Sequence, residues 1–159
     1  MNTLVQDIMI REVISVRSDM PLLEVAQILG EHKFDGVPVV DENNVLMGIL
    51  TEYDLISKGS AMHLPTLQTI FQNITVFRED RSRFKKETEE IANIKVADVM
   101  NTDPLTLSAD DSFEQAVAAF REHHRVNPIP VIDKDKKVVG VVSRYDIVKL
   151  FELTSNTNN

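Results

Sequence analysis

The segment "GILTEYDL" at residues 48–55 is repeated ninety-two residues later as "GVVSRYDI" at residues 140–147. Each copy consists of a glycine, an apolar run, a hydroxyl-bearing residue and, three positions further on, an aspartate. This pattern is typical of a buried strand that leads directly into a helix, because the hydroxyl and the carboxylate both accept hydrogen bonds from free N–H groups of the first turn. The sequence therefore predicts the same strand-to-helix turn twice.

The repeat extends well beyond these two turns. Residues 37–55, "VPVVDENNVLMGILTEYDL", align with residues 129–147, "IPVIDKDKKVVGVVSRYDI", and "VQDIM" at 5–9 returns as "VADVM" at 96–100. Apolar runs on either side of "DENN" and "DKDKK" predict two hairpins whose strands are buried on both faces. Ahead of each hairpin, apolar residues follow the spacing of one helix face: Leu22, Val25, Ala26 and Leu29, then Phe113, Ala116, Val117 and Phe120.

Helix-start signals and short apolar segments complete each copy. Pro21 marks the start of the first of these helices, and Ser112 with Gln115 forms a capping box at the start of the second. Short strands are expected near residues 13–16 and 104–107. A unit of about 50 residues buries too little surface to be stable alone, so the two copies should pack against each other.

The repeat also predicts the domain organisation. The first repeat is assigned to residues 1–57 and the second to residues 96–151. Residues 58–95 are a helical insert, with an apolar stripe and a charged, solvated stretch. Residues 152–159, "ELTSNTNN", have little apolar surface to bury and are expected to form a disordered tail. The stripe in the insert consists of Leu67, Ile70, Phe71 and Ile74.

Composition excludes several classes of protein. The chain has 159 residues, 43% of them hydrophobic, no cysteine and a formal net charge of −8. It can form neither a disulfide nor a thiolate metal site, and its acidity disfavours a long, sequence-independent grip on nucleic acid. Its apolar runs are too short to span a bilayer, and the N-terminus lacks the features of a signal peptide. A cytoplasmic protein bound to neither membrane nor nucleic acid is expected.

Catalytic motifs are missing from the sequence. The four histidines, at positions 32, 63, 123 and 124, have no spacing typical of a metal site. There is also no glycine-rich phosphate loop and no nucleophile elbow, and the chain has only five glycines. We therefore expect no enzymatic activity, no catalytic cofactor and no metal site.

The two turns allow two interpretations. Thr51 with Asp54, and Ser143 with Asp146, could simply cap the helices that follow them. Alternatively, the helix N-terminus and the hydroxyl could bind phosphate while the carboxylate accepts hydrogen bonds from the two hydroxyls of a ribose. In that case the preceding apolar residues, Ile49 and Val141, could lie against a flat base.

These segments resemble the cystathionine β-synthase (CBS) domain in its tandem form, the Bateman module. The resemblance rests on the repeated glycine, apolar pair, Thr or Ser and Asp of the turn, and on the "PVV" or "PVI" strand followed by Asp. It implies an α/β fold of the α+β type, in which two pseudo-twofold βαββα repeats pack through their sheets and leave two clefts. In this family such clefts bind adenosine compounds: AMP, ADP, ATP or S-adenosylmethionine.

The resemblance also implies which residues line each cleft. In both clefts the Ser or Thr and the Asp contact phosphate and ribose, and the other repeat encloses part of the base. One cleft would take Ser143, Asp146 and Val141 with Ile14, Gly36 and Val37. The other would take Thr51, Asp54 and Ile49 with Leu105, Pro128 and Ile129.

The neighbouring charges predict that the two clefts are unequal. Beside Thr51 the chain places Glu52 and Asp35, whereas the equivalent positions beside Ser143 are Arg144 and Asn127. An anion would therefore prefer the Ser143 cleft, where Arg144 and Asn127 are counted as ligand-binding residues.

Three functional classes follow. The leading one is a regulatory module that binds an adenosine ligand and acts in trans on an unidentified partner protein, most simply as a homodimer. The alternative is a structural or interaction module that has kept the caps but binds no ligand. An enzyme acting on nucleotides is a third class, but no acid–base pair for it is found.

Overall fold

A computed structural model describes residues 3–61 and 93–155, with side chains at 3–57 and 93–150. The predicted apolar stripe of the insert lies outside the described residues.

Two four-residue helices begin the two repeats, and each repeat then follows the predicted order. In the first repeat the elements are α1 (Val5–Ile8), α2 (Leu22–His32), β1 (Gly36–Val40), β2 (Leu46–Thr51) and α3 (Glu52–Ala61). In the second they are α6 (Val96–Val99), β3 (Leu107–Ser108), α7 (Phe113–Glu122), β4 (Ile129–Ile132), β5 (Val138–Val142) and α8 (Arg144–Ser155).

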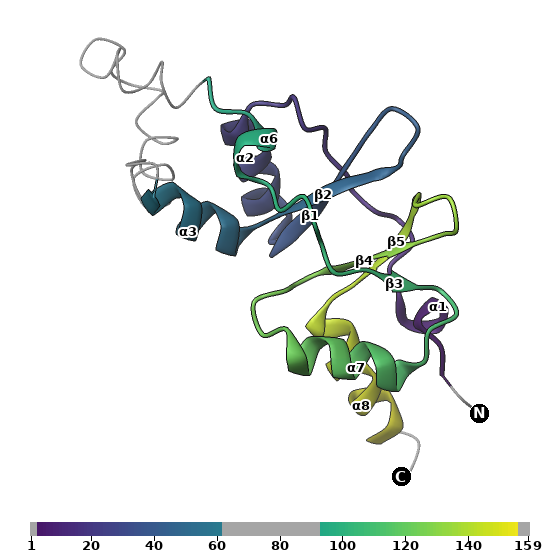
Figure 1. Cartoon of the computed structure of the whole chain (residues 1–159). Helices are drawn as coiled ribbons and strands as arrows, with labels where there is room; N and C mark the ends of the chain where they lie inside the picture. The colour runs from purple at the N-terminus through teal and green to yellow at the C-terminus, as the bar shows by residue number, and fades with distance from the viewer. Residues whose placement is uncertain (1–2, 62–92, 156–159) are drawn as a thin grey trace.

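Two antiparallel hairpins form the centre of the molecule, as predicted. β1 pairs with β2 and β4 pairs with β5 (Figure 1). All five residues of β1 are buried, which agrees with its uniformly apolar sequence. The predicted first strands are shorter than expected. One is reduced to the residue pair Val16 and Val39, and the other is the two-residue β3, which runs parallel to β4.

Aspartates shape the two hairpin turns. Asp41 Oδ1 accepts hydrogen bonds from the backbone N–H groups of Asn43 and Val45 at 2.8 and 2.9 Å, and Asp133 Oδ1 does the same in the second turn. Asn44 and Lys136 follow with positive φ angles of 64° and 60°. Aspartate side chains commonly accept such bonds from the backbone of a turn, so "DENN" and "DKDKK" form the turns that the sequence predicted.

The tips of the hairpins are joined to each other. The backbone N–H of Leu46 donates to the carbonyl oxygen of Lys136 at 2.9 Å, and that of Val138 donates to the carbonyl oxygen of Asn44 at 3.1 Å. Each bond is the counterpart of the other under the repeat alignment. The two repeats are therefore related by a pseudo-twofold arrangement, and the expected fold class is confirmed.

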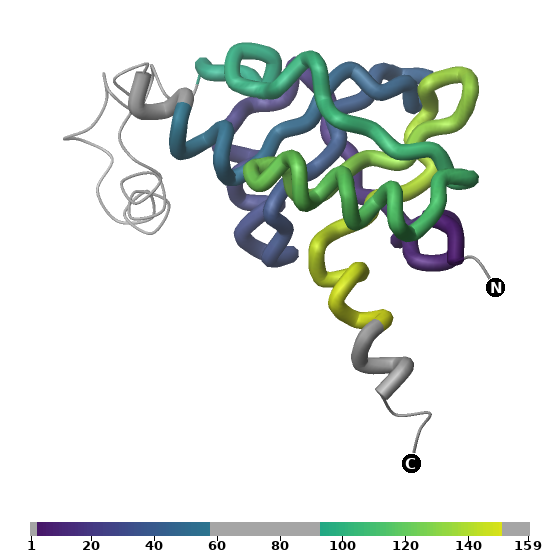
Figure 2. Tube along the Cα trace, turned by 60° about the horizontal axis from the view of Figure 1, so that its bottom comes forward, coloured from purple at the N-terminus to yellow at the C-terminus, as the bar shows by residue number. Residues whose placement is uncertain are grey.

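The short helices are exchanged between the repeats. α1 lies beside the second repeat and α6 beside the first, as Figures 1 and 2 show from two directions. The N–H of Val5 donates to the carbonyl oxygen of Asp111 at 2.8 Å, and that of Val96 donates to Met20 at 3.0 Å. The residues just after them pair with the hairpins, Ile10 with Val141 and Asn101 with Ile49.

The exchange determines the two hydrophobic cores. Each core contains residues of both sequence repeats, so a sequence repeat is not a packing unit. The first core is Val16, Leu22, Val25, Ala26, Leu29, Val37, Val39, Leu50, Leu55, Val96 and Val99. The second is Val5, Met9, Leu107, Ala116, Phe120, Ile129, Val131 and Val142.

Helix ends largely match the sequence signals. Pro21 is the N-cap of α2, and Ser112 caps α7 in the predicted box, with Gln115 Oε1 accepting from the N–H of Ser112 at 2.7 Å. α8 contains no glycine or proline and continues to Ser155, beyond the expected end of the repeat at residue 151. None of the helices within residues 3–61 and 93–155 has the length and apolar character needed to cross a bilayer.

Candidate functional site

The predicted capping geometry forms at the start of α8. The hydroxyl of Ser143 donates to Asp146 Oδ2 at 2.6 Å, and its backbone N–H donates to the same oxygen at 2.8 Å. Within the described residues, Asp146 Oδ1 accepts no hydrogen bond. The half-buried carboxylate therefore caps the helix through one oxygen and keeps the other for a further donor.

The equivalent turn at the start of α3 has the same bonds in a more enclosed setting. The hydroxyl of Thr51 donates to Asp54 Oδ2 at 2.6 Å and its N–H donates to that oxygen at 3.0 Å. Thr51 is 6% exposed and Asp54 is 8% exposed. Both turns thus satisfy the capping interpretation, and only the Ser143 turn combines it with a partly accessible carboxylate.

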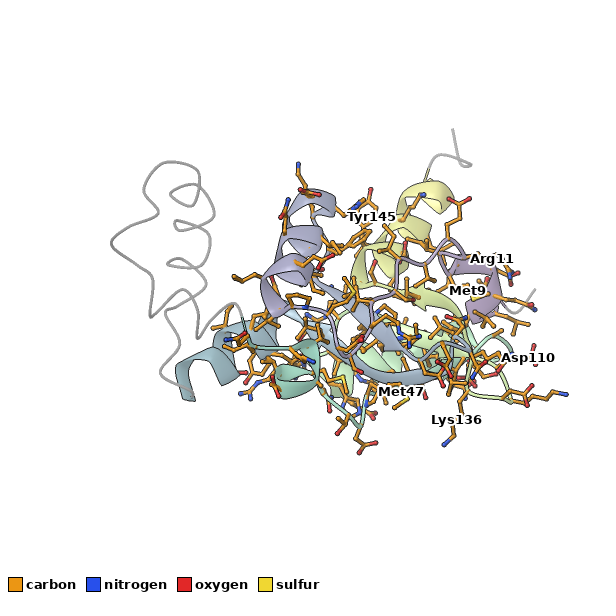
Figure 3. All side chains as sticks on the ribbon, turned by 90° about the horizontal axis from the view of Figure 1, so that it is seen from above. Met9, Arg11, Met47, Asp110, Lys136 and Tyr145 are labelled. Carbon is orange, nitrogen blue, oxygen red and sulfur yellow. The ribbon has the colours of Figure 1, made fainter. Side chains whose placement is uncertain are left out.

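A cavity of about 300 Å³ lies in front of the Ser143 turn. One wall comes from the second repeat, and the other comes from the segment after α1 and from the end of α2 with the start of β1. Figure 3 shows Tyr145 between α2 and α8, where these walls meet. The cavity is lined by Ile10, Glu12, Val13, Ile14, His32, Lys33, Phe34, Asp35, Gly36, Val37, Pro38, Pro128, Val141, Ser143, Tyr145 and Asp146.

Most residues expected at the Ser143 cleft are brought together in this cavity. Ser143, Asp146 and Val141 face Ile14, Gly36 and Val37 from the other repeat. Pro128, which the resemblance placed in the Thr51 cleft, also lies here. Arg144 and Asn127 do not line it.

Arg144 and Asn127 line a second, polar pocket of about 340 Å³ instead. It lies between the starts of α3 and α8 and contains residues of both turns. Its lining is Asp35, Thr51, Glu52, Tyr53, His124, Arg125, Asn127 and Arg144. The charges that were expected to distinguish two separate clefts therefore share one pocket.

The polar groups of the second pocket are largely paired with one another. Asn127 donates from Nδ2 to Asp35 and accepts at Oδ1 from the backbone N–H of Arg144 at 3.0 Å. The guanidinium of Arg144 donates to the carbonyl oxygen of His124. Arg125 donates to the hydroxyl of Tyr53 at 2.7 Å and lies over its ring. The expected attraction of an anion to the Ser143 cleft by Arg144 thus loses its geometric basis.

The remaining residues expected at the Thr51 cleft have other surroundings. Ile49 is buried and pairs through its backbone with Asn101 at 2.9 Å in both directions. Ile129 is part of the second core, and Leu105 is partly buried against that core. Thr51 lies on the second pocket.

Several lining residues of the first cavity were not predicted. Glu12, Lys33, Phe34 and Tyr145 each lie one to three positions from a predicted residue. A search of the flanking residues would have found them. Within the described residues, no group of three or more potential ligand side chains could hold a metal ion.

Comparison with known proteins relates this geometry to a family. A family model described as the CBS domain matches residues 5–60 and 96–153. An L-aspartate semialdehyde sulfurtransferase of Methanocaldococcus jannaschii is 30% identical over 149 residues, 94% of this chain and 23% of that protein. The chloroplastic CBS domain-containing protein CBSX2 of Arabidopsis thaliana is 26% identical over 127 residues, 79% of this chain and 53% of that protein. The chain thus spans only part of each relative.

Solved structures share the whole fold. The CBS domain pair of protein MJ0100, in complex with 5′-methylthioadenosine and S-adenosyl-L-methionine, matches with a TM-score of 0.71 and 25% identity. The match covers 97% of this chain and 99% of that one. CBSX2 from Arabidopsis thaliana matches in fold with a TM-score of 0.73 at 24% identity, over the whole of both chains. The chain belongs to the CBS domain family and contains a tandem pair of these domains.

Proposed function

We propose that this chain is a regulatory module that binds an adenosine compound in the Ser143 cavity and acts in trans on a partner protein. The observation that carries the proposal is the position of Asp146. Asp146, whose Oδ1 accepts no hydrogen bond within the described residues, lines a cavity whose walls come from both repeats and include aliphatic and aromatic side chains. A ribose diol needs such an acceptor, and a purine ring needs flat apolar walls.

The roles of the lining residues follow from this arrangement. Asp146 accepts from the ribose hydroxyls, while Val141, Ile14 and Val37 enclose the base. Gly36 also lines the cavity, and a side chain there has no room, since a Cβ would lie 2.9 Å from the Cγ2 atom of Thr51 on the paired strand. The complex of the MJ0100 domain pair with two adenosine compounds supports the ligand class.

A ligand in this cavity would contact both repeats at once. A compound that favours one relative orientation of the repeats shifts the population toward it by its differential affinity. A partner or second subunit could detect that orientation. We propose that the output is regulatory and not enzymatic, although some relatives of greater length are named as enzymes.

The Thr51 turn is a second candidate site in this proposal. Thr51 and Asp54 repeat the same bonds, and Ile49, Leu105, Pro128 and Ile129 stay as its proposed neighbours. Because Asp54 is nearly fully buried, this turn is proposed to bind more weakly than the Ser143 turn.

Calorimetry distinguishes ligand binding from the alternative, a ligand-free interaction module. Millimolar AMP, ATP, 5′-methylthioadenosine and S-adenosylmethionine would be titrated into the protein and also tested for a rise in melting temperature, which binding to the native state must produce. Asp146→Ala should abolish most of the signal. Asp110→Ala, which changes a residue outside the cavity, should not. If no compound gives heat or a thermal shift, the ligand-free module takes the place of the proposal.

A homodimer in the cytoplasm is the proposed assembly. Tyr53 and Ile56 on α3, and the equivalent Tyr145 and Val148 on α8, are at least 40% exposed. Two helices with exposed aromatic and aliphatic residues offer a surface that a second copy could cover. Sedimentation at tens of micromolar that shows only an 18.0 kDa species would contradict the dimer.

A further inference from the structure

The hydrogen-bond donors around the Ser143 turn are almost all in use. The Ser143 hydroxyl and N–H both donate to Asp146, and the N–H of Arg144 donates to Asn127 Oδ1. The N–H of Asp146 donates to the carbonyl oxygen of Ser143 at 3.1 Å. In the first turn of α8, only the N–H of Tyr145 has no acceptor among the described residues. A phosphate bound here would find one free donor where helix N-terminal phosphate sites use several.

The guanidinium closest in sequence to the turn is also committed elsewhere. Arg144 donates to the carbonyl oxygens of His123 and His124 and lies 5.9 Å from the ring centroid of Phe120. These contacts hold its charge in the second pocket, next to the end of α7. To pair with an anion in the Ser143 cavity it would have to give up these bonds.

The charges that do line the cavity are mainly negative. Among the described lining residues, Glu12, Asp35 and Asp146 are acidic and Lys33 is basic. Asp35 lies on the boundary with the second pocket, which it also lines and where its carboxylate accepts from Asn127 Nδ2. His32 adds a ring that stacks on Phe34 at 5.1 Å. An added phosphate dianion would therefore be repelled by more charges than attract it, whereas a cation would be attracted.

The rest of the lining suits an uncharged group. Ile10, Val13, Pro38 and Pro128 provide aliphatic surface, and Phe34 and Tyr145 provide aromatic surface. Phe34 is 39% exposed and Tyr145 is 66% exposed, so both are accessible to a ligand. A thioether or methyl group gains free energy from burial against such residues, and a sulfonium is attracted to both aromatic faces and carboxylates.

We infer that the Ser143 cavity selects adenosine compounds whose 5′ substituent is uncharged or cationic, a thioether or a sulfonium, over 5′-phosphates. This rests on the proposed function, and it specifies the class of ligand. Asp35 and Glu12 are the residues proposed to exclude the phosphate. Asp35 is one of the residues that the sequence had placed only beside the Thr51 turn.

The test compares four probes by calorimetry at pH 8 and low salt: adenosine, AMP, 5′-methylthioadenosine and S-adenosylmethionine. At this pH the phosphate of AMP is a dianion. Binding to the cavity is taken as the part of the heat that Asp146→Ala removes. 5′-Methylthioadenosine and S-adenosylmethionine should bind at least about tenfold more tightly than AMP, and adenosine should also bind more tightly than AMP.

Charge variants test the cause of the selection. Asp35→Asn and Glu12→Gln should each bring the affinity of AMP closer to that of 5′-methylthioadenosine. The matched control is Asp110→Asn, which removes the same charge from an exposed residue that Figure 3 places well away from Tyr145. It should leave the ratio unchanged. Melting temperatures of the variants show whether each is folded.

The outcomes separate the two levels of the proposal. If none of the four probes binds, the proposed function fails and the inference with it. If AMP binds as tightly as 5′-methylthioadenosine, or if Lys33→Gln removes a tight AMP site, the selection is wrong while the adenosine module stands. A preference for 5′-methylthioadenosine that neither Asp35→Asn nor Glu12→Gln reduces would overturn the assignment to these carboxylates.

Discussion

Asp54 and Asp146 occupy equivalent positions and make the same capping bonds, but they differ in burial. Replacing either with alanine removes the acceptor for two donors of its turn. At the half-buried Asp146 water can take over those donors, so the loss of unfolding free energy should be about 1 kcal/mol. At Asp54, which is 8% exposed, the donors of Thr51 would stay unsatisfied and the loss should be about 2–3 kcal/mol. Urea unfolding of the two variants measures this, and equal losses would contradict it.

Ligand affinity should show the opposite order. The double variant with Ser143→Ala and Asp146→Ala should lose most of the affinity for an adenosine compound, because it removes the hydroxyl and the carboxylate of the turn that lines the cavity. Thr51→Ala with Asp54→Ala should weaken binding less. Calorimetry on both, after a check that each is folded, provides the comparison. A larger loss from the Thr51 pair would show that the buried turn is the main site.

The chemistry of the site was predictable where it depends on local sequence. The hydroxyl-to-aspartate turns identify Ser143 and Asp146, and the repeat identifies the facing wall around Gly36. The direction of the Arg144 side chain was not predictable. A helix N1 residue can point toward the cavity or away from it, and here three-dimensional contact with the end of α7 decides.

At the scale of elements, two glycines mark where the exchanged segments cross the hairpins. A Cβ on Gly48 would lie 2.5 Å from the carbonyl oxygen of Asn101, and a Cβ on Gly140 would lie 2.6 Å from the sulfur of Met9. The first obstacle is backbone paired to a strand, while the second is a flexible side chain.

Alanine at these glycines should therefore have unequal effects. Gly48→Ala should reduce the free energy of unfolding by about 1–3 kcal/mol, because the strand pairing must shift. Gly140→Ala should cost less than about 1 kcal/mol, since the methionine can change rotamer. Thermal unfolding of both variants checks the order. Equal losses of unfolding free energy would contradict this prediction. They would mean that the backbone at Asn101, after α6, shifts as easily as the side chain of Met9.

Hairpins and long helices follow from the sequence, but α1 and α6 do not. Four residues are too few to show a helical period, and their caps are unusual. Asp7 and Asp98 accept hydrogen bonds at 2.9 Å from the backbone N–H groups of Leu4 and Lys95, which are not typical capping residues. The repetition of "VQDIM" as "VADVM" indicated that these segments matter without indicating their conformation.

For the whole molecule, the exchange predicts which half each segment stabilises. Val5 and Val96 are both 0% exposed and occupy equivalent positions in the two cores. Val5→Ala and Val96→Ala should each cost about 2 kcal/mol through the cavity that remains. Hydrogen exchange should show reduced protection mainly in β4 and β5 for Val5→Ala and in β1 and β2 for Val96→Ala. Protection lost in the hairpin of the same sequence repeat would contradict the exchanged packing.

Sequence alone could not reveal the exchange. The two short segments are nearly alike, so either could dock on either hairpin with similar side chains in contact. The path of the chain decides which hairpin each short helix packs against, because it places Ile10 beside Val141 and Asn101 beside Ile49. Such long-range geometry leaves no periodic pattern in the residues.

The exchanged helices also impose an order on folding during synthesis. The first core is complete once α6 has left the ribosome, but α1 must wait until β5 has been made before its own partner exists. Until α6 has been made, the apolar residues Val5 and Met9 have a free docking place on the first hairpin, where α6 belongs. Early docking there would be a non-native intermediate of the kind that larger chains form. Native folding then requires α6 to displace α1, so two nearly identical segments compete in time for one surface.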